Sequence, residues 1–369
     1  MNLLLYLCAW LVLQTPAQTR AEVRERWLES IELDMPSDVV REARERMGKD
    51  AEFKQDGQAL ALYARALSAT GGEALAFELL DKAQVSKAEE PYVQLALARL
   101  ELLKDDLDGL LRRLSTGKQL SSNPPASAAE QDAIVRYPQH ADSWWLLGKA
   151  QARMGQAERA APYLQRFVQT WRMHPEAPAA WHQLSQLALA RRDLESAKKY
   201  REQGQNLSTW HGYYKTRRLQ AQRNPQDALP RFGLAQLWSS VQEYARANQE
   251  IERCLALDAE FARGWALKGE LERKQNRMDS ARAAYTRALE LDGSLGDARY
   301  NRALLALQAG LKELAEQDLS TLVDGPESSA ERYLGAHLSL ARLLEDLGRQ
   351  ADAEVRFARY RQLGGKDAL

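Results

Sequence analysis

The sequence predicts an all-helical protein in which one helix–turn–helix unit recurs along most of the chain. Small and large residues repeat at an interval of about 34 residues, the length of two helices and their turns. Within each interval the apolar residues follow the 3.6-residue period of a helix. Of the 369 residues, 45% are hydrophobic and 28% are charged, which is the balance of a folded protein.

The clearest copy starts at Ala262, which we number as position 1 of the repeat. Positions 4, 8, 15, 20, 24 and 27 are then Trp265, Gly269, Asn276, Ala281, Tyr285 and Ala288. Positions 4, 7, 8 and 11 share one face of a first helix, and positions 20, 24 and 27 share one face of a second. Small residues at positions 8 and 20 let the two helices approach closely. Gly or Asn near position 15 ends the first helix, because both tolerate the left-handed conformation of a C-cap.

The same pattern starts at eight places along the chain. They are Gly57, Pro91, Ala141, Pro178, Ala228, Ala262, Gly296 and Leu334, and the first two copies are fainter than the rest. Position 8 is Gly, Ala or Ser in every copy, and position 20 is Ala in all except one, where it is Leu110. One pair cannot bury its apolar face alone, so we expect the pairs to stack on one another.

Two intervals, from 91 to 141 and from 178 to 228, are 50 residues long, and each excess is about one helix. We therefore predict two extra single helices, Ala128–Tyr137 and Tyr213–Arg223. The stretch Ser115–Ser127 is rich in Ser, Pro and Gly and predicts a linker. It would divide an N-terminal helical region (18–114), which begins with two helices before Gly57, from a C-terminal array (128–369).

The N-terminus differs from the rest of the chain. Leu3 to Leu13 is an apolar run of 11 residues, and a helix needs about 20 to span a bilayer. The small residues Thr15 and Ala17 follow it at the spacing of a cleavage site. The run predicts a signal peptide (1–17) cut after Ala17, and hence an exported protein, periplasmic or extracellular in a bacterial host. The alternative is an apolar helix packed on the protein.

The order of Trp, Leu-Gly, Ala, an aromatic residue and Ala resembles the tetratricopeptide repeat. The resemblance covers roughly Gly57 to Tyr360. It implies a right-handed α-solenoid of about eight copies plus the two extra single helices. It also implies a non-enzymatic scaffold that holds a peptide or protein partner in a concave groove, with a role in envelope assembly or secretion as one possibility. The alternative is a structural module that forms homo-oligomers by stacking through its last repeat.

In this family, positions 2, 5, 9, 12 and 13 of each first helix face the groove. The resemblance therefore implies a partner-binding set made of Trp145, Lys149, Arg153, His182, Gln186, Phe232, Gln236, Arg263, Glu270, Arg273, Lys274, Tyr300 and Leu304. We expect the aromatic residues at position 5 to be exposed anchors beside Arg and Lys; the alternative is that they pack on the neighbouring pair. The Lys–Asn pair with which family members bind an acidic C-terminal tail is missing, which disfavours that class of partner.

Other classes of function have little support. Lys+Arg and Asp+Glu are both 51, so net charge does not favour a nucleic-acid or membrane binder, although a local patch is possible. The basic, aromatic stretch Asn206–Gln226 could clamp a single-stranded nucleic acid, an acidic peptide or a sugar; a solvated helix face is the favoured interpretation. The five His residues lack metal-ligand spacing, and Cys254 is expected to be buried. We expect no metal, no cofactor and no catalytic residues.

Overall fold

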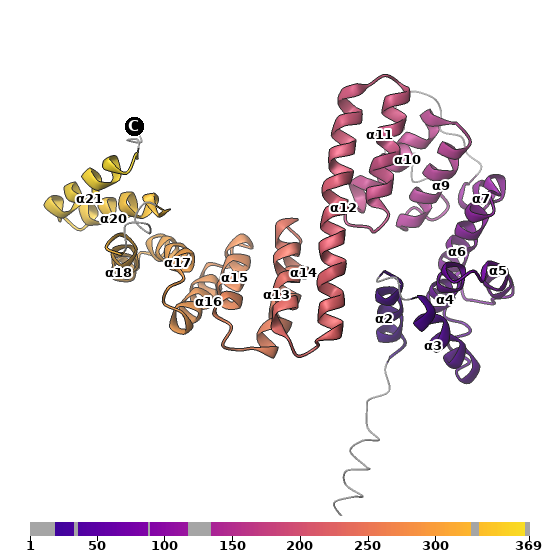
Figure 1. Cartoon of the computed structure of the whole chain (residues 1–369), viewed down its shortest axis with the longest axis horizontal. Helices are drawn as coiled ribbons and strands as arrows, with labels where there is room; N and C mark the ends of the chain where they lie inside the picture. Colours follow the sequence, from indigo (N-terminus) through magenta and orange to yellow (C-terminus); the bar gives the residue numbers. More distant parts are fainter. Residues whose placement is uncertain (1–18, 33–35, 88, 117–133, 326–331, 366–369) are drawn as a thin grey trace, which may run out of the picture. The chain divides into compact units, whose positions relative to one another are not determined.

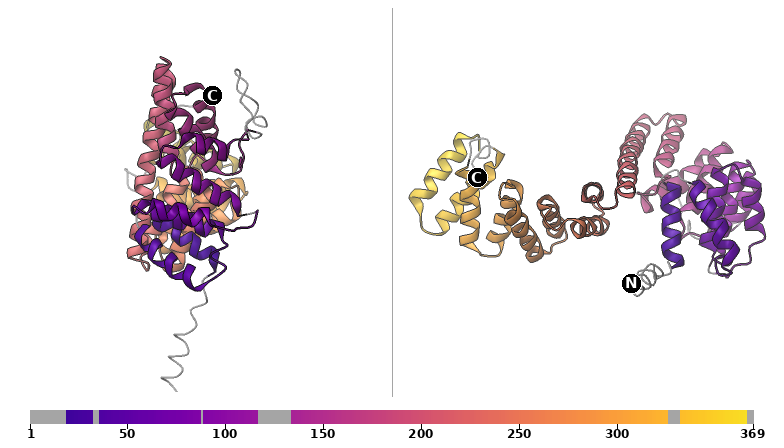
Figure 2. Two further views of the ribbon diagram at one scale, coloured as in Figure 1. Left: turned by 90° about the vertical axis from the view of Figure 1, so that its right-hand side faces the viewer. Right: turned by 60° about the horizontal axis from the view of Figure 1, so that its bottom comes forward.

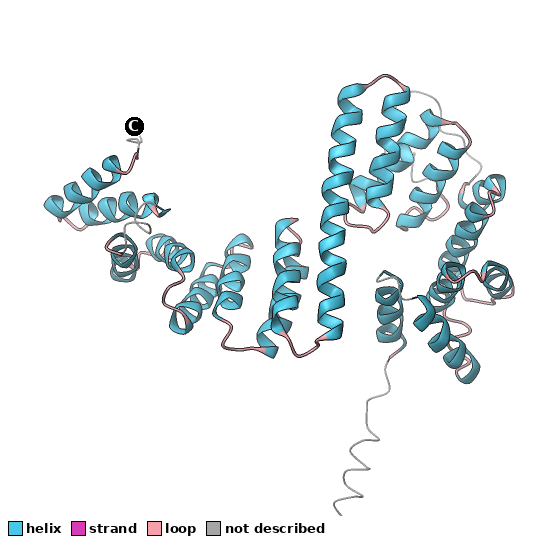
Figure 3. Ribbon diagram, in the orientation of Figure 1, coloured by secondary structure: helices cyan, strands magenta, loops and turns pink. Residues whose placement is uncertain are grey.

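The computed structural model describes residues 19–32, 36–87, 89–116, 134–325 and 332–365. These ranges form eighteen helices and no strand (Figures 1 and 3). The predicted signal peptide and its cleavage site lie outside the described residues. Successive helices lie side by side within each part of the chain (Figure 2). The predicted all-α solenoid is therefore confirmed.

The helix pairs begin where the repeats were predicted. They are α4 (Gly57–Ala69) with α5 (Glu73–Asp81), α6 (Glu90–Leu103) with α7 (Leu107–Leu114), α9 (Ala141–Arg153) with α10 (Ala157–Thr170), α11 (Ala177–Ala190) with α12 (Leu194–Arg223), α13 (Ala228–Ser240) with α14 (Tyr244–Leu257), α15 (Ala262–Lys274) with α16 (Met278–Leu291), α17 (Gly296–Gln308) with α18 (Lys312–Val323), and α20 (Leu334–Asp346) with α21 (Gln350–Gln362). Before them lie the two further helices that the sequence predicted, α2 (Arg20–Glu32) and α3 (Pro36–Lys49). Each first helix starts within one residue of its predicted position.

The close approach of the two helices in a pair depends on the small residue at position 8. A Cβ atom on Gly148 would lie 2.7 Å from the side chain of Leu164, and one on Gly269 would lie 2.7 Å from the ring of Tyr285. Leu164 and Tyr285 both stand at position 24 of their repeats. A larger residue at position 8 would separate the helices, which costs roughly 1–3 kcal/mol by overpacking.

The turn inside each pair is closed by a left-handed residue at position 15. The φ angles are +83° at Gly71, +59° at Asp105, +74° at Gly155, +60° at Arg192, +64° at Gln242, +61° at Asn276, +71° at Gly310 and +74° at Gly348. In every pair the amide at position 16 donates to the carbonyl at position 11 over 2.8–3.0 Å, which satisfies the end of the first helix. The four glycines avoid strain in this conformation and Asn and Asp tolerate it, whereas for Arg192 and Gln242 it costs roughly 1–2 kcal/mol.

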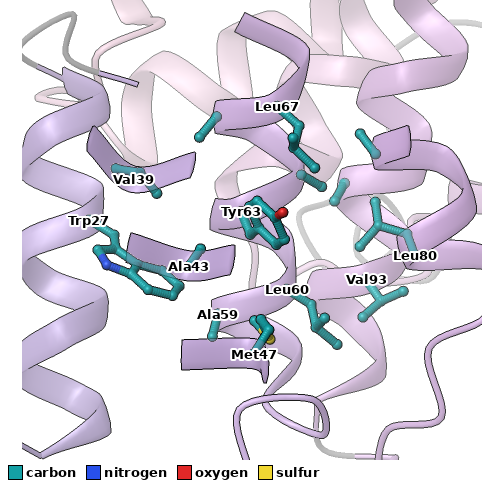
Figure 4. Packing of buried hydrophobic residues seen from close by; sticks show 14 of the residues in the cluster. Trp27, Val39, Ala43, Met47, Ala59, Leu60, Tyr63, Leu67, Leu80 and Val93 are labelled. Carbon is teal, nitrogen blue, oxygen red and sulfur yellow. The ribbon is translucent and has the colours of Figure 1, made fainter. Parts of the chain in front are cut away.

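The helices before the first repeat extend the array. Trp27 of α2 and Val39 and Met47 of α3 are buried against Leu60 and Tyr63 of α4 in one hydrophobic cluster (Figure 4). The exposed fraction of Trp27 is 1%. The pair α2–α3 therefore covers the apolar side of the first repeat, as a capping pair must.

The chain divides into two compact units, which meet between Lys215 and Thr216 inside α12. We call them unit 1 (to Lys215) and unit 2 (from Thr216). The sequence had placed a division at 115–127, most of which lies outside the described residues. The linker therefore stays a prediction. On either side of it, Leu114 of α7 and Trp144 of α9 belong to one hydrophobic core.

The two predicted extra helices differ in the structure. Residues 128–133 lie outside the described residues, and Ile134–Tyr137 is not helical, because Val135 forms a β-bridge with Ser115. The stretch Tyr213–Arg223 is helical but is not a single helix of its own, since α12 runs without a break for 30 residues. No proline interrupts this stretch before Pro225, so nothing ends the helix earlier.

The strain at position 15 gives a first prediction. Arg192→Gly and Gln242→Gly should each raise the free energy of unfolding by about 0.5–1 kcal/mol, because the relief of strain exceeds the added backbone entropy of the unfolded chain. Gly155→Ala should lower it by about 1 kcal/mol for the opposite reason. Urea unfolding followed by circular dichroism measures all three, and destabilisation by both glycine substitutions would contradict the assignment of this position.

Candidate partner-binding site

The first helices of unit 1 enclose a hollow with a volume of about 770 Å³. Its wall comes mainly from α4, α6 and α9, and these helices contribute the same repeat positions. The residues at positions 2, 5, 9, 12 and 13 are Gln58, Ala61, Arg65, Ser68 and Ala69 on α4, then Tyr92, Leu95, Arg99, Leu102 and Leu103 on α6, then Asp142, Trp145 and Lys149 on α9. The positions that the family resemblance assigns to a groove therefore line this hollow.

Large apolar side chains reach into the hollow without being covered. Leu103, at the end of α6, is 61% exposed, and Leu28, on α2, is 38% exposed. Leu62 and Leu146 lie deeper in the wall. Apolar surface left in contact with water inside a concave site is the usual mark of a ligand or partner site.

The polar floor of the hollow is a network centred on Arg99. Its guanidinium donates to both carboxylate oxygens of Asp142, at 3.1 Å and 2.5 Å, and to Glu176 at 3.3 Å. These three residues belong to α6, to the start of α9 and to the turn before α11. One side chain thus connects three successive pairs. The bidentate geometry fixes the position of Arg99 as well as its charge.

The network sets the charge of its neighbours. Burial opposes ionisation of Asp142, but the charge and hydrogen bonds of Arg99 outweigh it and lower the pKa of Asp142 to about 2. Nε2 of His174 lies 3.7 Å from Asp142, while its Nδ1 accepts a hydrogen bond from the amide of Glu176. Burial lowers the pKa of His174 to about 4, and Arg99 adds to the shift against the attraction of Asp142. His174 is therefore neutral at pH 7.

Lys149 is a cation of the hollow that forms no ion pair with the Arg99 network. Its ammonium group lies 4.9 Å from the centre of the Trp145 ring, and in the described structure it has no carboxylate at ion-pair distance. Burial lowers the pKa of Lys149. An acceptor on a bound partner would stabilise this charge.

Unit 2 has a smaller hollow of about 360 Å³ on its own first helices. Phe232 and Gln236 of α13 and Arg263 and Glu270 of α15 line it, together with Asn301 of α17. The guanidinium of Arg263 lies 5.4 Å from the centre of the Phe232 ring. This hollow is more polar than that of unit 1.

The structure separates the predicted partner-binding residues into three sets. Trp145 and Lys149 line the hollow of unit 1. Phe232, Gln236, Arg263 and Glu270 line the hollow of unit 2. Seven residues line neither, namely Arg153, His182, Gln186, Arg273, Lys274, Tyr300 and Leu304. Their partner contacts remain a prediction from the resemblance.

Some of these seven have structural contacts instead. Arg153 donates to the backbone carbonyl of Leu102 over 2.7 Å and so helps to cap α6. Exposed His182 and Gln186 are hydrogen-bonded to each other at 2.9 Å on α11. The ring of Tyr300 packs 6.0 Å from that of Tyr333 next to α20.

The expectation of exposed aromatic anchors at position 5 is wrong. Trp145 is 1% exposed and stacks on Phe167 of α10 at 5.8 Å, while Phe232 is 7% exposed and meets Phe261 edge-on at 5.1 Å. Tyr300 is half-buried. At position 5 the ring packs on an aromatic residue of its own pair, as Trp145 does, or on one just before the next pair, as Phe232 does. Burial of apolar area there outweighs contact with water.

Sequence reasoning missed most of the larger hollow. Arg65, Arg99 and Leu103 stand at positions 9, 9 and 13 of the two faint copies, to which the groove positions had not been applied. The same numbering on those copies would have found them. The contact of Arg99 with Glu176 could not have been found in this way, because 77 residues separate the two.

The remaining sequence features are accounted for by packing. Cys254 is fully buried, and burial raises the pKa of its thiol to about 11. In the basic, aromatic stretch, Trp210 and Tyr214 of α12 stack on each other at 5.2 Å.

No group of His, Cys, Asp and Glu in the described residues has the arrangement of a metal site. None of the described helices combines the length and apolar character needed to cross a membrane.

Residues 262–294, which form α15 and α16, match the family model of the tetratricopeptide repeat. With the repeated pairs described above, this places the chain in a class of helical interaction scaffolds. Residues 262–294 thus form a tetratricopeptide-type repeat, and repeats of this class support protein–protein interaction.

No curated protein matches this chain. Among solved structures, a crystal structure of MamA is similar at 16% identity and a TM-score of 0.35, over 52% of this chain and 93% of that one. MamA from Desulfovibrio magneticus RS-1 is 16% identical, with a TM-score of 0.34 over 52% and 96%. PilF of Pseudomonas aeruginosa is 14% identical, with a TM-score of 0.34 over 61% and 91%. Similarities this low transfer no function.

The neutral state of His174 gives a second prediction. The unfolded chain takes up a proton at this residue near pH 6.5, whereas the folded chain does so only near pH 4. Stability should therefore fall as the pH drops from 6.5 to 4, by up to about 3 kcal/mol from this residue. Asp142 stays ionised in this range. His174→Gln should remove that part of the pH dependence in urea unfolding, and His182→Gln is the matched control. Identical pH profiles for the wild type and His174→Gln would contradict the assignment.

Proposed function

We propose that the hollow of unit 1 holds a segment of a partner protein. The observation that carries this proposal is the exposure of Leu103 and Leu28 inside a concave wall of about 770 Å³. A preformed groove of this kind binds a peptide or helix with little loss of entropy on its own side. The Arg99 network, which connects three pairs, supports such preorganisation.

The lining defines the partner's chemistry. Leucine and alanine side chains on α4 and α6 favour large apolar side chains on the partner. Lys149, on the α9 side of the hollow, favours a hydrogen-bond acceptor or a carboxylate on the partner at that place. We infer that the segment is amphipathic, with its apolar side against α6 and a polar group near Lys149. Contact of the partner with Phe232, Gln236, Arg263 and Glu270 in unit 2 is part of the same proposal.

The stacking alternative has less support. Position 28 carries the buried apolar residues Val168, Leu255, Leu289 and Val323 in α10, α14, α16 and α18. In the last pair this position is Arg361, which is exposed. A charged residue at that place disfavours the docking of a second copy on α21.

We also propose that the protein is exported and that its partner is an envelope protein. The support is the apolar run from Leu3 to Leu13 and the small residues Thr15 and Ala17 after it.

The proposal predicts that Leu103→Asp abolishes partner capture. Proteins crosslinked to the full chain in envelope fractions are identified by mass spectrometry, and their recovery is compared between variants. Leu103→Asp should lower recovery of a groove partner at least tenfold, because a charge in an apolar contact is not solvated. The mass of the captured chain, shorter by residues 1–17, tests export separately.

Leu75→Asp is the matched control for this experiment. Leu75 is 47% exposed on α5 and does not line the hollow. Both leucines are exposed, so both variants should fold, which circular dichroism verifies. Equal recovery with Leu103→Asp and with the wild type would overturn the groove assignment.

A further inference from the structure

The turn between α11 and α12 exposes two leucines. Leu189, near the end of α11, is 42% exposed, and Leu194, the first residue of α12, is 69% exposed. Leu194 is the most exposed large hydrophobic side chain in the part of the chain that the structure describes. Neither leucine lines the hollow of unit 1. Their exposure is not explained by the groove.

Basic side chains surround these leucines. Arg191, Arg192, Lys198, Lys199 and Arg201 are all exposed, and within the described residues none of them forms an ion pair. Leu194, Lys198 and Arg201 are spaced i, i+4 and i+7, so they share one face of α12. The surface therefore combines apolar and cationic groups at one end of the pair.

The acidic residues nearby do not neutralise this surface. The carboxylate of Asp193 accepts a hydrogen bond from the amide of Ser196 over 3.0 Å and so caps α12. From Arg191 to Glu202 the chain has five cationic and three anionic side chains, the other two acids being Glu195 and Glu202. The stretch has an excess of two positive charges in a chain whose net charge is zero.

Arg192 places one of these cations at the turn itself. It stands at position 15 with a φ of +60°, a conformation that the turn imposes on all eight repeats. Four of the other repeats have glycine there, and the remaining three have Asp105, Gln242 and Asn276. Among the eight repeats, the pair α11–α12 alone has a cation at this position.

We propose that the α11–α12 turn, residues 189–201, docks on an anionic phospholipid surface. Leu189 and Leu194 enter the interfacial region, while the arginine and lysine side chains reach the headgroups, as amphipathic side chains do at membrane interfaces. Anionic lipids attract such basic segments in proportion to their number of cations. An acidic protein would need only the charges, whereas a lipid surface also uses the two leucines. The proposal is independent of the groove function.

The test is cosedimentation of the full chain with phosphatidylcholine vesicles that do or do not contain phosphatidylglycerol. The difference between the two measures the anionic contribution and cancels binding by the apolar N-terminal run. The wild type should bind the anionic vesicles more strongly, and added salt should weaken the difference. Arg192→Gly should reduce it about fivefold, the effect of one cation at an anionic surface.

Gln242→Gly is the matched control, because it makes the same backbone change on α13–α14. Both glycine variants should be at least as stable as the wild type, so a failure to fold does not confuse the result. Of the two glycine variants, only Arg192→Gly should bind the anionic vesicles more weakly. The double variant Leu189→Ser with Leu194→Ser should also lose binding, which a purely electrostatic surface would not.

Two results would overturn the proposal. One is equal binding of the wild type to anionic and neutral vesicles. The other is binding to polyglutamate that weakens in Arg192→Gly, together with vesicle binding that is unchanged in the leucine variant. That second result would assign the turn to an acidic protein instead.

Discussion

The contact between position 8 of the first helix and position 24 of the second is the constraint on which the rest of the structure depends. At Gly148 and Gly269 there is no room for a Cβ atom, and the other six pairs have Ala or Ser at this position, so the two helices of a pair can lie close together. The left-handed residue at position 15 then fixes the turn between them. Because both constraints recur in register, the first helices within each unit present the same positions to the same side.

The hollow of unit 1 is a consequence of that register. Positions 2, 5, 9, 12 and 13 meet on one side of α4, α6 and α9, whatever residues occupy them. The fold thus determines where a groove forms, and the residues at those positions determine what it binds. Leu103 and Lys149 supply an apolar and a cationic contact, and Arg99 keeps three pairs in place around them.

The sequence was sufficient for the periodic part of the structure. Close packing at positions 8 and 20 restricts residue type strongly, so the starts of all eight pairs could be located from the chain alone. The sequence was insufficient for contacts between residues that lie far apart in the chain, because no repeat position determines them. The burial of Trp145 depends on Phe167 in the next helix, and the contact of Arg99 with Glu176 joins residues far apart in the chain. The continuity of α12 was not predicted from the sequence. After Ala197 the repeat pattern of apolar residues is absent, and this absence was interpreted as the end of one helix and the start of another.

The central claim is that the partner lies against the first-helix face of unit 1. Site-specific photocrosslinking tests it most directly, with a photoreactive amino acid placed at Leu103 in the hollow or at Leu75 on the surface of α5. The account predicts a crosslinked partner from position 103 and none of that mass from position 75. Crosslinking of the same partner from position 75 alone would contradict it.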